Sequence, residues 1–475
     1  MEFDDSARKM QKIKGLTIKT PSGKSLTLTE PVRADSRSVV FEETSDQMLV
    51  RLFLPTGSDA LDTDLYDRLG FLSTAKMPDD VVVIEDLIRK PYVGYTTRKP
   101  EGYQHLSPFL VFRGNSSYRS WYNKGQGLRG RLSIGRAIAK LFYELEGAGL
   151  TCCEVSGETV LVRPGGMASV RMLDAGRMYV GGKISAPVIE GHFYAAPEVL
   201  DGEMSPGELS DDYALALIIF DLLHINRPRP NNVATSATVD KYDGFYPIRL
   251  LREKAMQLRS AIHDDPAFTN SMRDLFDRCI CGGSEGRALR PSALDFEIAL
   301  LDASNRIVQC PKCGAWFYQQ NMQNGHDLCP WCNAHVMPAP RLDFYEALSR
   351  GEDYRTSKLL SKRLVRSYIL KPGINPIPNY YVFGQSSSFE EDGIFDDCLT
   401  ITKDSEGCRA LKADSKSSIT VYRRATKRGY GLGNARSMRL QEGDRIFFGE
   451  ADQTKTIIGD ETYFLSSMAE FSEAL

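Results

Sequence analysis

The chain has 475 residues, of which 42% are hydrophobic and 25% are charged, a composition that excludes a wholly disordered, collagen-like or coiled-coil protein. Its 59 Lys and Arg and its 62 Asp and Glu give a formal net charge of −3, so no overall attraction to nucleic acid or to an anionic membrane is expected. With roughly 150 residues per domain, this length predicts about three domains.

No segment has the features of a membrane span or a signal peptide. The strongest apolar run, Ala214 to Ile225, is interrupted by Asp221 and His224, whereas a span needs about 20 mostly apolar residues. The N-terminal residues MEFDDSARKM are acidic and lack the apolar core of a signal peptide. We therefore expect a cytoplasmic protein without a membrane partner, whose ten cysteines are thiols or metal ligands rather than disulfides.

The N-terminal hundred residues have the pattern of strands. Residues 15–30 alternate between apolar and polar around Pro21-Ser22-Gly23, which predicts a hairpin. Further strands are expected within 38–55, 81–88 and 93–97. After residue 105 the period becomes helical: Ile134, Ile138, Leu141, Phe142 and Leu145 share one face, and Gly147 follows them. More helices are expected over 214–224, 249–263, 267–280 and 292–303. Strands followed by helices indicate an α+β arrangement.

The C-terminal third returns to strands. Residues 338–366 have the pattern of a linker with one or two helices. The spacing of the basic run Arg355, Lys358, Lys362, Arg363, Arg366 and Lys371 suits one exposed helix face. From Ser367 onward, short apolar runs recur every 8–15 residues between Gly, Asn, Asp and Ser, which predicts a β-sandwich.

Four of the ten cysteines form a metal-binding pattern. They are arranged as Cys310-Pro-Lys-Cys313 and Cys329-Pro-Trp-Cys332, with fifteen residues between the pairs. Each turn can direct two thiolates at one ion, and two turns complete the four-thiolate shell of a structural zinc site. We predict a zinc ribbon over residues 306–337 and no catalysis at the metal, because no coordination position stays open.

Four further motifs lie between the first strands and the cysteines. They are Asp174-Ala175-Gly176, Tyr194-Ala195-Ala196-Pro197-Glu198, Ser210-Asp211-Asp212-Tyr213-Ala214-Leu215 and Arg290-Pro291-Ser292. Their order and spacing resemble the Asp-Phe-Gly, Ala-Pro-Glu, central-helix and late Arg-Pro motifs of protein kinases. The resemblance implies a bilobal kinase-like domain over residues 15–305, in which Asp211 holds the catalytic-loop backbone and Arg290 pairs with Glu198.

The residues that cradle phosphate in protein kinases are replaced. The segment expected to form the glycine-rich loop, residues 31–41, contains no glycine. No lysine lies between Lys24 and Lys76, so Arg51 takes the place of the nucleotide-binding lysine, for which it is not an equivalent. Asp64 and Asp67 are the acids nearest to the expected helix glutamate.

The residues that carry proton transfer and metal binding are also mostly replaced. No histidine lies between His105 and His192, so the His-Arg-Asp motif is missing. Glu154 lies near the position of the base, Thr159 lies near that of the metal-binding Asn, and Asp174 alone is kept as a ligand for Mg²⁺.

Two wider resemblances suggest partners. MPDDVVVIEDLIRKPYVGYTTRKP (77–100) and the kinase-then-ribbon order resemble bacterial kinase-like proteins of tellurium-resistance-type gene clusters, which occur with a phosphatase and a von Willebrand-type protein. LQEGDRIFFG (440–449) resembles a late turn and strand of forkhead-associated domains. However, Gln385 follows Gly384 where that family has Arg, and no histidine follows His335, so residues 367–475 favour a structural or protein-docking sandwich.

The sequence thus predicts a multidomain α+β protein with a kinase-like domain (15–305), a zinc ribbon (306–337), a helical linker (338–366) and a forkhead-associated-like sandwich (367–475). We expect a pseudokinase that scaffolds or regulates protein partners in bacterial phospho-signalling or stress response. The alternative is an atypical Ser/Thr kinase that uses ATP, with Glu154 as base, Arg51 on phosphate and Asp174 on Mg²⁺.

A third possibility is a nucleic-acid-associated regulator that acts through the ribbon. Gly314 to Leu328 contains no Lys or Arg, which disfavours nucleic acid as a partner. The basic cluster Arg423, Arg424, Lys427 and Arg428 has two interpretations, a solvated face or a docking patch for an acidic partner or phosphate.

Overall fold

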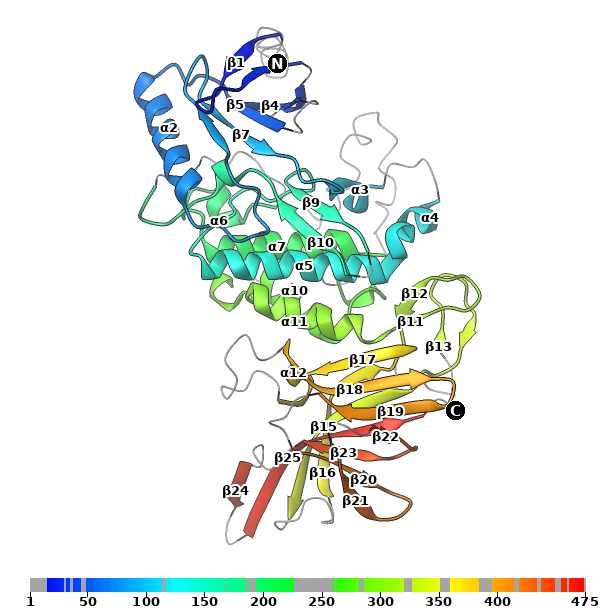
Figure 1. Ribbon diagram of the computed structural model, residues 1–475. Helices are drawn as coiled ribbons and strands as arrows, with labels where there is room; N and C mark the ends of the chain where they lie inside the picture. Colours follow the sequence, from blue (N-terminus) through cyan, green and yellow to red (C-terminus); the bar gives the residue numbers. More distant parts are fainter. Residues whose placement is uncertain are drawn as a thin grey trace. The chain divides into compact units, whose positions relative to one another are not determined.

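The computed structural model describes residues 15–29, 31–34, 37–43, 48–112, 117–165, 167–184, 187, 194–225, 259, 262–281, 286–319, 327–350, 359–383, 395–413, 418–433, 437–448, 454–458 and 461–473. Contacts divide the chain into two compact units, residues 1–301 and 302–475. The first contains sheets and helices, and the second consists mainly of strands, so the protein is a mixed α/β protein (Figure 1). None of the described helices is long and apolar enough to cross a membrane.

The first unit begins with a five-stranded antiparallel sheet in the order β3-β4-β5-β7-β6. Its strands are β3 (Pro31–Ala34), β4 (Ser38–Glu43), β5 (Met48–Phe53), β6 (Asp86–Ile88) and β7 (Gly94–Arg98). A hairpin of β1 (Thr17–Lys19) and β2 (Ser25–Thr27) covers it, because Ile18 and Leu26 share one apolar core with Phe41 and Val50. The hairpin agrees with the prediction for residues 15–30.

Helix α2 (Asp59–Thr74) follows β5 and packs against β6 and β7. Asp59 and Asp62 lie in its first turn, where negative charge complements the helix dipole. Its buried face consists of Arg68, Leu69 and Leu72. Periodicity in the sequence does not predict this helix, which only the kinase resemblance implies, near Asp64 and Asp67.

The rest of the first unit is mainly helical and includes a small sheet in the order β10-β9-β8. Its helices are α3 (Ser107–Leu110), α4 (Tyr118–Tyr122), η1 (Lys124–Gln126), α5 (Gly127–Gly147), η2 (Ala175–Arg177), α6 (Pro197–Leu200), α7 (Glu208–Leu223), α10 (Asn270–Phe276), η3 (Asp277–Cys281), η4 (Arg287–Leu289) and α11 (Ala293–Ser304), and its strands are β8 (Gln104–His105), β9 (Val160–Arg163) and β10 (Ser169–Met172). Helix α7 is buried all round, as expected for a helix without a polar face. Residues 249–258, within another predicted helix, lie outside the described residues.

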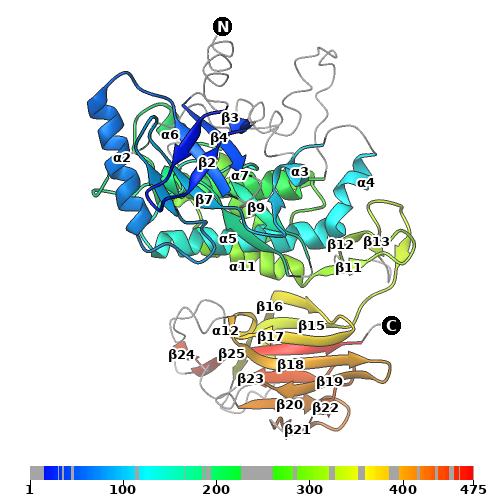
Figure 2. The same cartoon turned by 45° about the horizontal axis from the view of Figure 1, so that its top comes forward.

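The second unit has two larger sheets. One runs β16-β15-β25-β23-β20-β21, with β24 also paired to β25, and the other runs β17-β18-β19-β22 (Figure 2). The strands are β15 (Arg341–Arg350), β16 (Leu359–Ile369), β17 (Gly373–Pro378), β18 (Asp397–Asp404), β19 (Gly407–Lys412), β20 (Ile419–Arg423), β21 (Arg428–Gly431), β22 (Met438–Arg439), β23 (Arg445–Phe448), β24 (Thr454–Ile458) and β25 (Glu461–Ser472), and α12 (Asn379–Phe383) follows β17. Phe344, Tyr368 and Tyr381 form a buried group of rings.

The helical linker predicted for residues 338–366 is wrong. This stretch contains β15 and most of β16, which pair along their length. The basic residues that suggested a helix face are held across strands instead: Lys362 pairs with Glu470, and Arg363 lies 2.7 Å from Glu346. The spacing of these basic residues suggested a helix. The acidic partners that reveal the strands are distant in sequence and leave no local signal.

Candidate functional site

The first unit contains a cleft between its five-stranded sheet and its β8-β9-β10 sheet. It encloses about 590 Å³ including its open mouth, with Val40 and Leu49 on the wall formed by the five-stranded sheet. Leu161 and Leu173 line the opposite wall, beside the β8-β9-β10 sheet. Charged residues gather around these aliphatic walls: Arg33, Glu42, Arg51, Lys99, His105, Glu158 and Asp174.

The carboxylate of Asp174 is held by two arginines within this cleft. Arg51, from β5, donates from Nη2 to Oδ2 over 2.6 Å and from Nε to Oδ1 over 3.2 Å. Arg33, from β3, also donates to Oδ2, and its Nη1 donates to the carbonyl of Glu158 over 3.2 Å. Both carboxylate oxygens, the atoms that would bind a metal ion, are therefore already engaged by cations.

The Asp174 backbone has a φ of 67°, in the left-handed region. Asp tolerates this region better than most residues do. The two arginines anchor the side chain in that conformation.

Arg51 is almost completely buried, at 2% exposure of its side chain. Its Nη1 donates to the hydroxyl of Ser38 over 2.5 Å. Burial by itself lowers the pKa of Arg51, but Asp174 and Tyr95 outweigh it, and the pKa lies above its ordinary value. Arg51 is thus a permanent buried cation whose charge is matched inside the protein.

Glu154, the predicted alternative base, is held in a second pair. Its carboxylate lies against Arg177, with the two side chains 8% and 12% exposed. Thr159, beside the expected metal position, donates its hydroxyl to the carbonyl of Glu154 over 3.3 Å and accepts from the N–H of Ser156. These two hydrogen bonds tie Thr159 to the backbone of Glu154 and Ser156 and so stabilise the turn that contains Glu154.

Helix α2 contributes a cation near the cleft rather than the expected acid. Arg68 is buried and donates to the carbonyl of Met178 over 2.9 Å. Asp64 and Asp67, the acids that the sequence offered for this helix, are exposed and lie away from its buried face. Arg51 therefore has Asp174, and not a helix carboxylate, as its acidic partner.

The residues assigned to the kinase frame make short buried contacts. The carboxylate of Asp211, in α7, accepts from the N–H of Cys152 over 2.5 Å and from that of Cys153 over 3.3 Å. Burial raises the pKa of Asp211 to about 7, against the effect of those two donors. Asp211 thereby ties the segment before Glu154 to the central helix.

Glu198 and Arg290 form a bidentate ion pair. Nη1 and Nη2 of Arg290 lie 2.5 and 3.0 Å from the two carboxylate oxygens. Burial by itself raises the pKa of Glu198, but the hydrogen bonds from Arg290 outweigh this effect, so the pKa lies below its ordinary value. Arg290 also donates to the carbonyl of Leu209, which joins α6 to the start of α7.

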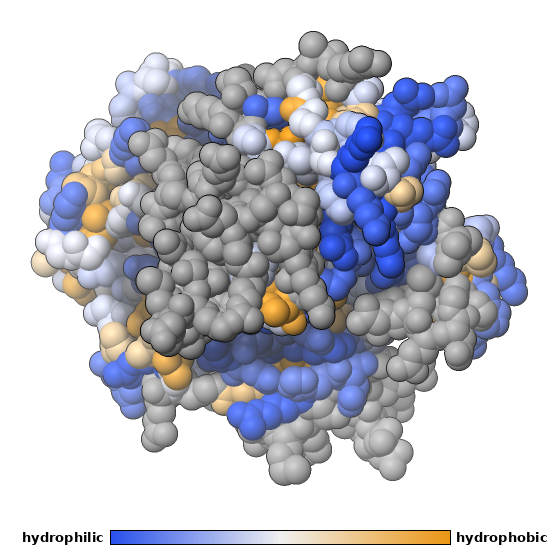
Figure 3. All heavy atoms as spheres, turned by 90° about the horizontal axis from the view of Figure 1, so that it is seen from below, coloured by the Kyte–Doolittle hydropathy of each residue, from blue (hydrophilic) through white to orange (hydrophobic). Residues whose placement is uncertain are grey.

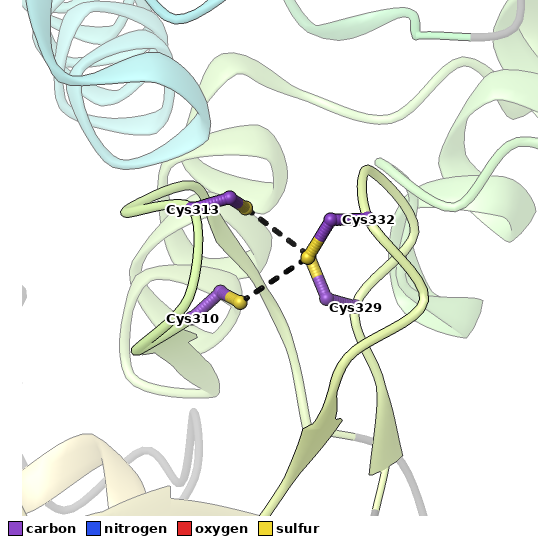
Figure 4. Close-up of side chains that lie close together, drawn as sticks. All are labelled: Cys310, Cys313, Cys329 and Cys332. Atoms are coloured by element: carbon purple, nitrogen blue, oxygen red, sulfur yellow. Dashed lines mark hydrogen bonds between the residues drawn. The ribbon is translucent and has the colours of Figure 1, made fainter.

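The second unit contains the four-cysteine cluster, which can hold a metal ion such as zinc. The sulfurs of Cys310, Cys313, Cys329 and Cys332 all lie within 4.8 Å of one another, and none is in a disulfide. Cys310 and Cys332 are 3.6 Å apart, as are Cys313 and Cys329 (Figure 4). Four sulfurs bound tetrahedrally at about 2.3 Å would be about 3.8 Å apart, close to these distances.

The two cysteine turns have matching backbones. Each leads between short strands, β11 (Ile307–Gln309) and β12 (Trp316–Tyr318) in one hairpin, β13 (Asp327–Leu328) and β14 (His335–Val336) in the other. The residue after each second cysteine, Gly314 or Asn333, has a positive φ and donates to the carbonyl of the first cysteine over 2.9 Å. The turns thus direct the sulfurs inward, and Ile369 of β16 packs on the cluster.

Three arginines that complete these contacts were missed by the sequence analysis. Arg33 and Arg177 neutralise Asp174 and Glu154, and Arg68 occupies the buried face of α2. The only sequence signal was indirect: Asp174 at the position of a kinase-like motif, with no lysine between Lys24 and Lys76, requires some other cation nearby. His335 lies beside the cluster and His326 lies outside the described residues, and neither is among the grouped ligands.

Comparison with known proteins does not assign the chain to a family. No family model matches the sequence, and no curated protein matches it.

Proposed function

We propose that residues 15–305 adopt a bilobal protein kinase-like fold that binds partners without transferring phosphate. The support is the order of its parts: a five-stranded antiparallel sheet with one helix, a cleft, and a helical part whose Asp211 and Glu198–Arg290 contacts match the kinase-like roles predicted from the sequence. Phosphoryl transfer relies on positioned metal ions and cations around the phosphates.

The single observation that carries the loss of catalysis is the engagement of Asp174. To hold Mg²⁺, its carboxylate would have to release Arg51 and Arg33. Releasing Arg51 would leave a buried guanidinium without its counter-charge, which is strongly unfavourable. The alternative, an atypical Ser/Thr kinase, would also require Glu154 to leave Arg177 before it could accept a proton.

The cysteine cluster is proposed to be a structural zinc ribbon. Four converging sulfurs are the donor set that Zn²⁺ prefers in closed sites. Bound zinc would supply folding free energy that two short hairpins cannot obtain from burial alone. Cys310, Cys313, Cys329 and Cys332 would fill its coordination shell.

The remaining strands are proposed to form a forkhead-associated-like β-sandwich that serves in docking. The two sheets and their buried rings Phe344, Tyr368 and Tyr381 support a sandwich. Gly384 and Gln385, which bear on phosphopeptide recognition, lie outside the described residues.

Taken as a whole, the chain is proposed to be a pseudokinase scaffold or regulator in a bacterial phospho-signalling or stress system. A cleft with internally matched charges, joined to two modules of binding type, supports protein partners rather than a reaction. A phosphatase or a von Willebrand-type protein is the partner that the family resemblance suggests.

Thermal-shift titration of the full chain with ATP and Mg²⁺, combined with a phosphate-transfer assay, tests this function. We expect no transfer to general protein substrates and no Mg²⁺-dependent stabilisation. Phosphate transfer that disappears in Asp174→Asn but persists in a matched surface variant, Asp79→Asn, would contradict the proposal and establish the kinase alternative.

A further inference from the structure

The hairpin of β20 and β21 presents an unusually open end of a sheet. Residues 424–431, which include its turn and all of β21, are exposed without interruption. β20 itself is anchored, since Val421 is fully buried and pairs with Ile446 of β23. The hairpin therefore combines a fixed base with a free outer strand.

β21 is the terminal strand of its sheet. Among the described residues it pairs with β20 only, so its other edge carries backbone N–H and C=O groups without strand partners. Gly429 and Gly431 leave that strand with little side-chain cover, and a Cβ at Gly431 would meet only open space. Such an edge can accept another extended segment by strand addition.

The charged residues of the hairpin itself are all basic. Residues 418–433 and 437–440 contain five basic residues and no acidic ones: Arg423, Arg424, Lys427, Arg428 and Arg439. Arg423 is held by Asp444 and by the carbonyl of Arg439. Arg424, Lys427 and Arg428 are exposed and form no ion pair within the described part of the chain.

We propose that this edge binds an acidic, extended segment of a partner protein, which adds to the sheet as a strand beside β21. Backbone hydrogen bonds would hold the segment, and its carboxylates would face Arg428 and the cations of the turn. The inference does not depend on the kinase-like cleft or on the zinc ribbon.

Other occupants fit less well. A second copy of the hairpin would bring like charges together, which disfavours pairing of two identical edges. Nucleic acid would satisfy the charges but would leave the unpaired backbone edge without strand hydrogen bonds. On the face drawn in Figure 3, apolar residues of described placement form small groups between hydrophilic ones.

The strand geometry also specifies the partner sequence. Side chains alternate between faces along a strand, so Arg428 and Tyr430 lie on one face, whereas Gly429 and Gly431 lie on the other. Acidic residues at every second position would face Arg428, and β-branched residues between them would cover the glycines. The recognised segment is therefore one that alternates acidic and β-branched residues.

The test uses the full chain and a fluorescein-labelled ten-residue peptide of alternating Glu and Thr. Binding is followed by fluorescence anisotropy, and hydrogen exchange reports the amides of residues 428–431. We expect saturable binding, slower exchange at those amides and at least about tenfold weaker binding in the variant Lys427→Glu/Arg428→Glu. The control variant Lys19→Glu/Lys124→Glu reverses two exposed charges in the first unit and should bind like the unaltered chain.

Two further probes separate strand addition from simple charge attraction. A peptide of alternating Glu and Pro keeps the charge but has a fixed φ and half the N–H donors, so it should bind at least about tenfold more weakly. A single-stranded thymidine decamer should not slow exchange at residues 428–431. No saturable peptide binding, equal binding of the proline peptide, or an unchanged affinity in the Lys427→Glu/Arg428→Glu variant would each overturn the proposal.

Discussion

The cleft of the first unit and the cysteine cluster of the second both gather chemically reactive side chains, but they satisfy them differently. In the cleft, each acid of catalytic interest has an arginine partner from the same chain, as in Asp174 with Arg51 and Glu154 with Arg177. In the cluster, four like groups face one another and contain no counter-charge among themselves. The first arrangement pairs its charges within the chain, whereas the second offers four sulfurs that can hold a metal ion.

Metal removal should produce the largest effect and should affect only the cluster. We expect about one zinc per chain, no zinc in Cys310→Ser, and local unfolding of the two hairpins, because apparent zinc affinities of such sites are about 10 kcal/mol or more. Trp331 packs on the cluster and Trp316 begins β12, in the hairpin that contains Cys310 and Cys313, so their fluorescence should shift to longer wavelength. Cys281→Ser, outside the cluster, is the control; a zinc-free chain with unshifted fluorescence would refute the metal site.

Breaking the frame behind the cleft should be the next largest effect. Arg290→Met removes the cation from the buried Glu198 and should lower the free energy of unfolding of the first unit by about 3 kcal/mol. The double variant Arg290→Met/Glu198→Leu should recover part of that loss, because the uncompensated buried charge disappears. Chemical denaturation measures the stability of both variants. Equal stability of Arg290→Met and the unaltered chain would show that the Arg290–Glu198 pair does not stabilise the first unit.

Asp174→Asn should destabilise the first unit by about 2 kcal/mol, because it leaves buried Arg51 without its counter-charge. In a protein that uses Asp174 for Mg²⁺, the same change would chiefly affect metal binding. Thermal unfolding without nucleotide separates the two interpretations. Arg33→Ala should lower the free energy of unfolding less, since Arg33 is more exposed than Arg51. No loss of stability in Asp174→Asn would contradict the claim that Asp174 neutralises the buried Arg51.

The smallest predicted effect is a pH dependence that arises behind the cleft. Burial, followed by Glu208, raises the pKa of Glu146 to about 7, and burial, followed by Glu146, raises that of Asp212 to about 9. Both acids bind protons more tightly when folded, so their contribution is fully present below about pH 4 and is lost as pH rises through 7 and 9.

We expect the free energy of unfolding of the first unit to fall as the pH rises from 5 to 9. Asp211 and Asp295 also face this pair and share in the trend. Denaturation across pH measures it, and Asp212→Asn should flatten the curve. A stability that rises over this interval in the unaltered chain would show that the two carboxyls are ionised in the folded state.

Local patterns made much of the fold predictable. The hairpin at residues 15–30, helix α5 and helix α11 follow from periodicity and turn residues, which act over a few positions. The cysteine cluster was predictable for the same reason, since each turn places its two ligands three residues apart. By contrast, β15 has buried residues on both faces, Leu342 and Phe344 on one and Ala347 on the other, so it lacks the alternation that identifies a strand.

The contacts of the cleft could not be predicted in this way. Arg51 and Asp174 are 123 residues apart in sequence, and Arg33 and Asp174 are 141 apart. Sequence resemblance located Asp174 and Arg51 separately, but only the fold brings them together and adds Arg33. Under the kinase resemblance, the missing lysine predicted lost chemistry, and Arg33 and Arg51 show how Asp174 is neutralised.

Binding of Mn²⁺, observed by electron paramagnetic resonance on the full chain in the presence of ATP, tests the central claim most directly. Mn²⁺ takes the oxygen ligands that Mg²⁺ takes, so it reports on Asp174 and not on the cysteine sulfurs. We predict the spectrum of Mn²⁺ bound to free ATP alone, identical for the unaltered chain and for Asp174→Asn. A protein-bound Mn²⁺ signal that disappears in Asp174→Asn would contradict the claim that the arginines occupy this carboxylate.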